Sequence, residues 1–429
     1  MLIDFKVKNY RSLRDEQLLS MVASKDKTLI KSNTSDSGLK VVSRLLRSAV
    51  IYGQNAGGKS NLIKAMQYMR AVIMESASIM QPGQFFGVQP FRLDADSSKV
   101  PTEFEITFML KGVRHQYGFS ITSERVVNEY LLVYKAFKPQ LWFDRRYDSV
   151  TNEYIYKPTN FLKGQKALWE SATRQNSLFL SMAVQLNSEQ LRPIFDWFST
   201  QLIIFNELSP LNSQLSIEML KTPEGKEAIS HFMSAADISI AEIELVTRRQ
   251  SVLSMHADFV GGKHEMKNEE QDVTEILFHH VTDKGKAVFG LGDESTGTRN
   301  LLFLIGPILE MVQNGVTLII DELDTSLHPL LVRKLVELLH NSDTNMRGAQ
   351  LIFSTHDTSL LDPDLFRRDQ IWFVEKTRDQ SSKLYTLSDF NLRKNELFER
   401  GYLIGRFGAL PFFSDRLIKN NNFRHKNGS

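Results

Sequence analysis

The chain has 429 residues with a formal net charge of +2, and its 42% hydrophobic and 24% charged residues are typical of a folded globular protein. The absence of cysteine excludes disulfides, thiol catalysis and cysteine-ligated zinc. The near balance of charge gives no global basic field for nucleic acid, and no apolar run reaches the roughly 18 residues of a membrane span. We therefore expect a cytoplasmic protein without a membrane partner, longer than one ordinary domain.

The first elements predicted in chain order are two strands separated by a turn and a loop. Residues 1–8 alternate between apolar and polar, which is typical of a strand, and residues 9–12 (Asn-Tyr-Arg-Ser) have turn composition. Residues 22–42 are polar and predict a surface loop. Residues 48–52 (Ser-Ala-Val-Ile-Tyr) predict a short buried strand.

A complete phosphate-binding loop, G-x-x-x-x-G-K-S, follows this strand and precedes a helical apolar pattern at residues 61–69. Its glycines let backbone N–H groups close around phosphates, and the helix N-terminus adds partial positive charge. Lys59 is expected to reach the β- and γ-phosphates of ATP, and the Ser60 hydroxyl to ligate Mg²⁺. The nucleotide-binding residues predicted here are Gly53, Gln54, Asn55, Ala56, Gly57, Gly58, Lys59, Ser60 and Asn61.

Two β-hairpins are predicted after the phosphate-loop helix. Residues 81–84 (Gln-Pro-Gly-Gln) predict a helix stop and a turn. Residues 102–107 and 113–121 alternate on either side of Lys111-Gly112 and predict the first hairpin. A second hairpin or meander is predicted through residues 130–143.

Helices are predicted in the middle of the chain. Residues 168–182 and 188–198 have helical spacing, with Ser188 as a candidate N-cap, and residues 222–224 (Thr-Pro-Glu) predict a further helix start. Residues 250–271 are polar and contain Gly-Gly, which predicts a mobile loop. The end of the chain, from residue 419, is basic and Asn-rich and predicts a frayed terminus.

Two apolar strands predicted later in the chain finish in groups that suit nucleotide chemistry. The first leads into Asp321, which suits the Mg²⁺ shell, and Glu322, which suits activation of the attacking water. The second, at residues 350–355, leads into His356. A helical pattern between the strands allows them to be parallel neighbours, which would place His356 beside Asp321 and within reach of a γ-phosphate. The predicted catalytic residues are Glu322 and His356.

A second anion site is predicted at residues 293–299 (Asp-Glu-Ser-Thr-Gly-Thr-Arg), which open an apolar helix that Asn-Gly terminates at residues 314–315. The phosphate loop already serves one ATP. Ser295, Gly297 and Thr298 are therefore expected to close over the nucleotide of a second subunit. The expected assembly is a two-fold homodimer with two ATP molecules at its interface.

These motifs, in this order, resemble those of ABC-type ATPases of the SMC/RecF-like branch. The resemblance rests on the phosphate loop with its Asn55, the Ser-x-Gly-Thr segment, Leu-Asp-x-Ser-Leu-His-Pro at 323–329, Ser-Thr-His-Asp at 354–357 and the opening Phe-x-Val-x-Asn-Tyr-Arg-Ser. The Leu-Ser-Gly-Gly-Gln signature of transporter ATPases is absent. The resemblance implies an α/β fold, a P-loop NTPase of ABC-ATPase head type with a parallel core sheet plus an antiparallel β-subdomain and, in this chain, a helical insertion.

The expected domain organisation follows from that resemblance. Residues 1–158 would form the N-terminal part of the ATPase head, with the phosphate loop and the β-hairpins. Residues 159–272 would form a helical insertion with a mobile loop. Residues 273–429 would form the C-terminal part of the head, with the signature, the Walker B strand and the switch histidine.

More narrowly, the chain is similar to prokaryotic stand-alone ATPases of the AAA-15/AAA-21, abortive-infection group. The shared segments include Pro-Phe-Arg-Leu-Asp at 90–94, Asn-Ser-Leu-Phe-Leu-Ser at 176–181 and Gly-Arg-Phe-Gly-Ala-Leu-Pro at 405–411. The similarity implies a sensor or regulator in anti-phage defence that uses ATP and Mg²⁺. Its partners would be a separately encoded effector, often a TOPRIM-like or HNH nuclease, and a phage protein as trigger.

The same resemblance implies further site residues. Arg11, Ser12 and Asp324 are expected to border the nucleotide. A glutamine that senses Mg²⁺ is expected between the first helix and the hairpins, with Gln89 as the candidate and Gln84 as the alternative. Together with Ser60 and Asp321, Gln89 completes the expected magnesium ligands.

Two other functions remain open. A RecF-like ATPase of DNA repair or chromosome maintenance would bind DNA through clustered basic residues, with Arg145-Arg146 and Arg367-Arg368 as candidates. The interpretation we favour for both pairs is ordinary solvated charge. A slow-turnover, nucleotide-gated scaffold would bind a partner with little hydrolysis, although the presence of both catalytic candidates argues against it.

Overall fold

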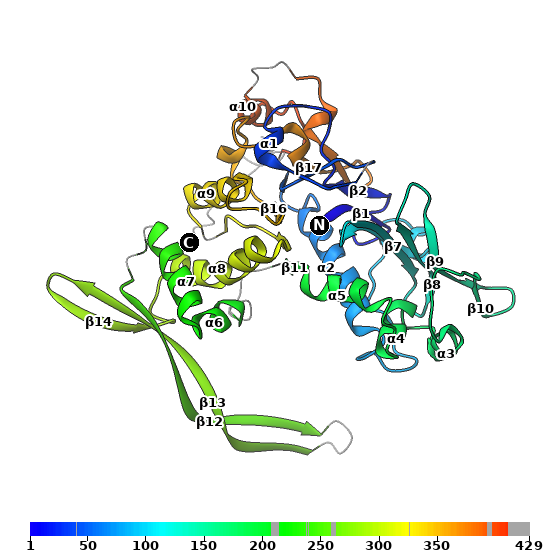
Figure 1. Cartoon of the computed structure of the whole chain (residues 1–429), viewed down its shortest axis with the longest axis horizontal. Coiled ribbons are helices and arrows are strands. Elements are labelled where there is room, and N and C mark those ends of the chain that lie inside the picture. The colour runs from blue at the N-terminus through cyan, green and yellow to red at the C-terminus, as the bar shows by residue number, and fades with distance from the viewer. Residues whose placement is uncertain are drawn as a thin grey trace, which may run out of the picture.

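The computed structural model describes residues 1–39, 41–206, 214–236, 238, 240–258, 263–325, 327–392 and 397–410. It contains two large β-sheets with helices between and beside them (Figure 1). Within this part of the chain, no helix combines the length and the apolar character needed to cross a bilayer. The frayed terminus predicted from residue 419 onward lies outside the described residues.

The first large sheet is the parallel core, with strand order β11-β15-β16-β5-β17-β18. All neighbouring strands are parallel except β18, which runs antiparallel to β17. Its strands are β5 (Ser48–Gly53), β11 (Leu202–Phe205), β15 (Thr317–Ile320), β16 (Gln350–Ser354), β17 (Ile371–Lys376) and β18 (Ser382–Thr386).

Both faces of this core sheet are buried. In β5, Ala49 and Ile51 belong to one hydrophobic cluster, and Val50 and Tyr52 to another on the opposite face. Burial on both faces explains why the central strands read as continuous apolar runs. Helices contributing to the first cluster are α2 (Lys59–Glu75), α3 (Lys166–Ala172), α4 (Phe179–Gln185) and α5 (Arg192–Thr200). Those contributing to the second are α6 (Gln214–Leu220), α7 (Pro223–Ala235), α8 (Thr296–Asn314), α9 (Pro329–His340) and α10 (Phe398–Leu403).

The second large sheet is antiparallel and has the order β10-β9-β8-β7-β6-β1-β2. Both predicted hairpins are present in it, and Lys111 (φ 51°) and Gly112 (φ 72°) form the two-residue turn that such a hairpin favours. The predicted fold class, a P-loop domain with a parallel core sheet plus an antiparallel sheet, is confirmed. Its strands are β1 (Leu2–Lys8), β2 (Gln17–Ser20), β6 (Thr102–Leu110), β7 (Val113–Ile121), β8 (Val126–Tyr134), β9 (Gln140–Asp148) and β10 (Glu153–Tyr156).

The prediction of one helix at 168–182 is wrong, because the segment between α3 and α4 is held in an irregular turn. The Asn176 side chain there donates to the carbonyl oxygens of Gln81 and Gln84 at 2.7 and 3.0 Å. The buried Glu129 carboxylate accepts the backbone N–H groups of Phe179 and Leu180 at 2.6 and 2.9 Å, which starts a new helix.

The predicted helix at 188–198 begins later than expected. The structure starts α5 at Arg192, with Leu191 as its N-cap and a proline in its first turn. Ser188 is therefore not the N-cap. The helix start predicted at Thr222 is correct, since its side chain accepts the Gly225 N–H at 3.1 Å.

The loop predicted at residues 22–42 contains short regular elements. They are α1 (Ile30–Asn33) and β3 (Thr34–Asp36), which pairs with β4 (Arg44–Leu46). Asn33 is buried, and its amide donates to the Leu365 carbonyl oxygen and the Gln370 side chain. The polar composition of this segment led to a wrong prediction, because its buried polar groups form hydrogen bonds with residues far away in the sequence.

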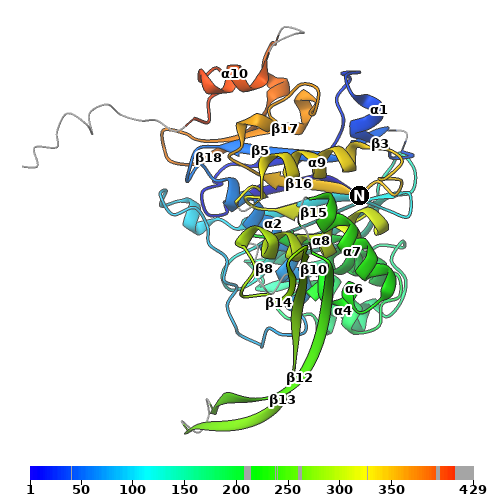
Figure 2. The same cartoon turned by 90° about the vertical axis from the view of Figure 1, so that its left-hand side faces the viewer.

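The mobile loop predicted at residues 250–271 is also wrong. The structure has a long antiparallel hairpin there, formed by β12 (Glu242–Asp258) and β13 (Lys263–Thr282), and β13 pairs again with β14 (Gly285–Gly290). Both views show the hairpin extending away from the body of the protein (Figures 1 and 2). With 17 residues in β12, it spans about 55 Å.

Candidate functional site

Three neighbouring parallel strands, β15, β16 and β5, end at one edge of the core sheet and carry the predicted site residues. β16 lies between the other two and pairs with both. Asp321 and Glu322 follow β15, His356 lies two residues beyond β16, and the phosphate loop follows β5. The expectation that the first two strands are parallel neighbours is confirmed. In α/β sheets, ligands bind at this carboxyl edge.

The Lys59 amine is held at this edge and is only 5% exposed. It donates to the Gly53 carbonyl oxygen at 2.7 Å and lies 3.2 Å from Nε2 of His356. Burial lowers the pKa of Lys59, and the acids that follow β15 act in the opposite direction. Within the described chain, no carboxylate is paired with this ammonium group at ion-pair distance. Its charge is therefore available to a phosphate.

The glycines of the phosphate loop are required by close packing. Gly58 has φ +118°, and a Cβ there would lie 2.2 Å from the Ser382 hydroxyl oxygen. A Cβ on Gly53 would lie 2.3 Å from the Val374 carbonyl oxygen. Any larger residue at these positions would therefore displace β17 or β18, the two strands that support the loop.

Ser382, which the sequence did not reveal, connects the loop to the start of the chain. Its hydroxyl donates to the Gly57 carbonyl oxygen at 2.6 Å and lies 2.8 Å from the Ser12 hydroxyl. The Ser12 hydroxyl also accepts from the Asn61 amide at 2.7 Å. The structure thus brings Ser12 and Asn61 together at the loop.

The two acids after β15 are fixed by Ser354, the last residue of β16. Its hydroxyl donates to Oδ1 of Asp321 and accepts the backbone N–H of Glu322 at 2.8 Å. Glu322 has φ +51°, a left-handed conformation that costs a non-glycine residue about 1 kcal/mol. Such strain is concentrated at functional sites. Here it leaves Asp321 buried and Glu322 exposed.

Asp324 links the segment after β15 to His356. Its Oδ2 accepts the backbone N–H of His356 at 3.1 Å, whereas its Oδ1 is buried without a hydrogen-bond partner. Asp357 likewise has a buried Oδ2 with no partner. Leaving a buried acceptor unsatisfied costs about 1–3 kcal/mol, so these atoms favour an additional donor or cation at this edge.

The two candidate glutamines make different contacts. The backbone carbonyl oxygen of Gln89 accepts the N–H of Arg11 at 2.7 Å, next to Ser12. The Gln84 carbonyl oxygen accepts from Asn176, and its side chain accepts the N–H of Gln81 at 3.0 Å. The Nε of Arg11 is buried and lacks a hydrogen-bond partner.

The predicted signature segment forms the beginning of α8. Ser295 is the N-cap, and its hydroxyl accepts the Thr298 N–H at 3.1 Å. In the described part of the chain, no hydrogen bond or ion pair joins this segment to the phosphate loop of the same chain. Glu294, which precedes it, lies with Oε1 2.7 Å from Nε2 of His280 in β13. The segment is thus attached to the projecting hairpin.

The residues at the carboxyl edge fit a nucleotide with Mg²⁺. The Lys59 ammonium has no carboxylate partner among the described residues, and Gly58 provides a close backbone approach. Asp321 and Asp324 provide the oxygen ligands or outer-shell acceptors that Mg²⁺ prefers. Gln54, Asn55 and Ser60 belong to the loop, and their side chains make no hydrogen bond among the described residues.

In each arginine pair considered for DNA binding, the first arginine is buried and makes contacts within the protein. The predictions of a DNA contact and of a solvated charge are therefore both wrong for these two residues. Arg145 is 0% exposed, lies 3.8 Å from the Glu129 carboxylate and donates to the Ser177 carbonyl oxygen at 2.7 Å. Arg367 is 1% exposed and pairs with Asp369 at 2.7 Å. Neither of these two side chains is available to DNA.

Most of the chain matches a known family model. Residues 48–362 match the family model described as "AAA domain, putative AbiEii toxin, Type IV TA system". The comparison with curated protein sequences found no match.

Among solved structures, the chain is similar to the SMC head domain from Thermotoga maritima, with 14% identity, a TM-score of 0.40, and coverage of 90% of this chain and 98% of that one. It is similar to an SmcHead bound to the C-winged helix domain of ScpA, with 14% identity, a TM-score of 0.41, and coverage of 92% and 98%. A Smc head domain with an extended coiled coil, bound to the C-terminal domain of ScpA derived from Pyrococcus furiosus, gives 12% identity, a TM-score of 0.39, and coverage of 94% and 98%.

Proposed function

We propose, from the finding that the chain belongs to the AAA-domain family of the AbiEii-toxin type, that this ATPase-type domain binds and hydrolyses ATP as a two-fold pair of subunits. The observation that carries the proposal is the meeting of three strand ends, at which the Lys59 amine lies 3.2 Å from Nε2 of His356. The acids that follow β15 lie close enough to affect the pKa of that amine.

Each residue at the edge has a specific role in this proposal. The loop, Asn61, Arg11 and Ser12 hold the nucleotide, with the Lys59 charge directed to its phosphates. Ser60, Asp321 and Gln89 would hold Mg²⁺, which when bound would neutralise charge on the phosphate oxygens. Glu322 accepts a proton from the attacking water. His356 contacts the γ-phosphate and is oriented through its backbone bond to Asp324.

The two-fold pairing accounts for the signature segment. An α8 of 19 residues carries partial positive charge at its N-terminus, where Ser295, Gly297 and Thr298 lie. This end makes no hydrogen bond or ion pair with its own phosphate loop among the described residues. In an isologous dimer it would reach the ATP held by the other subunit, and each subunit would complete the site of its partner.

The biological role we propose is that of a sensor or regulator in anti-phage defence, which controls a separately encoded effector, such as a nuclease, after a phage trigger. The support is the family description, which names an abortive-infection toxin and a type IV toxin–antitoxin system. Phage plating on cells that carry the wild-type or the Glu322→Gln gene with its neighbouring genes tests this role. Equal phage plating on cells that carry the wild-type gene with its neighbours and on cells that lack these genes would contradict the defence role.

The hydrolysis proposal is tested by release of inorganic phosphate from Mg-ATP. We expect Glu322→Gln to reduce the rate at least 100-fold, and Glu310→Gln, a control in the body of α8, to leave it unchanged. Equal rates for wild type and Glu322→Gln would contradict the role of Glu322. Binding of ATP without measurable release by the wild type would favour the nucleotide-gated scaffold.

A further inference from the structure

A cavity lies at the amino ends of the core strands, at the sheet edge opposite the phosphate loop. This cavity of about 700 Å³ is bordered by Arg47 just before β5, by Arg347 and Gly348 before β16, and by Gly315 before β15. The six residues of β5 that separate Arg47 from the loop span about 20 Å. The cavity is therefore distinct from the ATP site.

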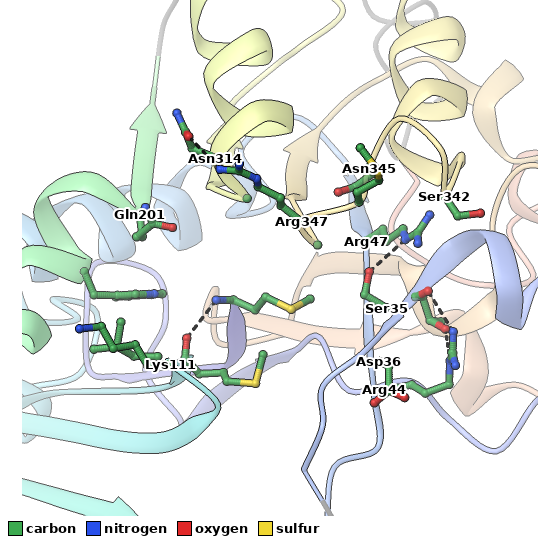
Figure 3. Close-up of a pocket in the computed structure, with 18 of the residues that line it drawn as sticks. Ser35, Asp36, Arg44, Arg47, Lys111, Gln201, Asn314, Ser342, Asn345 and Arg347 are labelled. Carbon is green, nitrogen blue, oxygen red and sulfur yellow. Dashed lines mark hydrogen bonds between the residues drawn. The ribbon is translucent and has the colours of Figure 1, made fainter.

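Positive charge dominates the lining of this cavity. Figure 3 shows Arg44 and Arg47 on one side, Arg347 and Asn314 above, and Lys111 with Gln201 on the opposite side. A single acidic side chain accompanies five cationic ones, so the lining carries an excess of positive charge. The charged residues concerned are Lys31, Arg44, Arg47, Lys111, Arg347 and Asp36.

Arg47 is the most informative of them, because it is 6% exposed and pairs with no carboxylate of the described residues. Its Nε donates to the Ser35 hydroxyl at 3.0 Å, and its Nη1 donates to the His340 carbonyl oxygen at 2.9 Å. Both acceptors are neutral, and no acceptor within the described chain contacts its Nη2. A buried cation is normally paired with an anion, so this guanidinium can bind an anion from solution.

Among the described residues, the neighbouring arginines likewise have no carboxylate partner. Arg44 donates to the side chain and carbonyl oxygen of Thr34 and to the carbonyl oxygen of Ile30. Arg347 donates to the Asn314 side chain at 3.4 Å. The Asp36 carboxylate accepts the N–H of Gly38 at 2.8 Å and makes no ion pair with any described residue. Burial, and secondarily the Arg44 charge, lowers the pKa of Arg47, as expected for unneutralised neighbours.

We propose that this cavity binds a small phosphate-bearing anion of nucleotide size, separately from the ATP of the phosphate loop. Guanidinium groups match phosphate oxygens in geometry and charge, and a phosphate can neutralise more than one of them. A volume of about 700 Å³ is in the range of small-molecule sites. Strand β6, the region from α1 to β4 and segments that precede the core strands surround the cavity, which suits a compact ligand better than an extended nucleic-acid strand (Figure 3).

The test is calorimetric titration of the full chain carrying Lys59→Ala, which removes the competing site at the phosphate loop. The probes are inorganic pyrophosphate, adenosine monophosphate and a single-stranded oligonucleotide, at low ionic strength. The pocket variants are Arg44→Gln and Arg347→Gln. The matched control is Lys99→Gln, an exposed lysine of another segment. Because Arg347 is exposed, its variant keeps the test valid even if Arg44→Gln does not fold.

We expect saturable binding of pyrophosphate or adenosine monophosphate that each pocket variant weakens at least tenfold and the control leaves unchanged. Tighter binding of the monophosphate would identify a nucleotide as the ligand, and tighter binding of pyrophosphate a simple phosphate anion. No saturable binding of either probe would overturn the proposal, as would binding that the pocket variants do not affect. An oligonucleotide bound tenfold more tightly than both small probes would overturn the small-ligand assignment.

Discussion

The Lys59 amine and Nε2 of His356 lie 3.2 Å apart, although 297 residues separate them in the chain. One belongs to the phosphate loop and the other follows the strand beside it. In the proposed function, this contact would bring His356 within reach of the phosphate that Lys59 would hold.

The first prediction concerns that lysine. Lys59→Ala removes the only cation of the loop, and we expect ATP affinity to fall at least 100-fold by calorimetry. Lys64→Ala is the matched control, since Lys64 lies one turn further along α2. Unchanged ATP binding by Lys59→Ala would refute the assignment of the loop.

The signature segment gives a prediction with an internal control. Ser295→Arg and Ser295→Ala both remove the N-cap of α8, at a cost of about 1 kcal/mol. Only the arginine adds bulk and charge at the proposed subunit interface. We expect Ser295→Arg to retain ATP binding and lose hydrolysis, and Ser295→Ala to keep most of its turnover. Normal phosphate release by Ser295→Arg would contradict a role for this segment in the partner's site.

Arg145 and Arg146 are adjacent in sequence but have opposite environments. Arg145 is buried against Glu129, and Arg146 has a side chain that is 69% exposed. Arg145→Ala leaves the Glu129 carboxylate buried without its cation, so we expect a loss of about 3–5 kcal/mol in denaturant unfolding. Arg146→Ala should change stability by less than about 0.5 kcal/mol. Equal effects of the two substitutions would show that Arg145 is not structural.

Acid should destabilise the protein through His340. Burial, with the Arg47 charge as the second cause, lowers the pKa of His340 from 6.5 to about 3. Below about pH 6.5 the unfolded chain therefore binds a proton that the folded protein does not, and stability falls as the pH decreases towards about 3. At pH 5 this single group costs about 2 kcal/mol.

Unfolding of wild type and His340→Gln between pH 7 and pH 5 measures that effect. We expect the variant to be less stable at pH 7 but to lose less stability on acidification. His328→Gln, at the exposed N-cap of α9, is the control and should follow the wild type. The buried His115 also has a lowered pKa, of about 4, and contributes equally to all three proteins. Parallel pH profiles for wild type and His340→Gln would contradict the assignment.

Local motifs predicted three strands of the parallel core, because each of these apolar strands leads into a predicted site residue. The sequence alone therefore places Gly53, Asp321 and His356 at one sheet edge. Ser354 and Ser382 could not be recognised in this way. Their roles depend on contacts with residues far away in sequence, such as the one that links Ser382 to Ser12 across 370 residues.

The wrong predictions also concern features that depend on pairing between separate segments of the chain. The outer part of the hairpin β12–β13, residues 250–258 and 263–271, is paired through its backbone, and its polar composition favoured the interpretation as a loop. The burial of Arg145 and Arg367 depends on partners from other segments, which adjacency in sequence does not reveal. The basic cavity arises in the same way, since separate parts of the chain contribute its charges.

The most direct test of the ATP-dependent dimer is the mass of the Glu322→Gln protein in solution, measured by light scattering with and without Mg-ATP. Removing the carboxylate proposed to activate water should trap ATP between the subunits. We expect the mass of one 49.2 kDa chain without nucleotide and twice that mass with Mg-ATP. A mass that is the same in both conditions would contradict dimerisation around ATP.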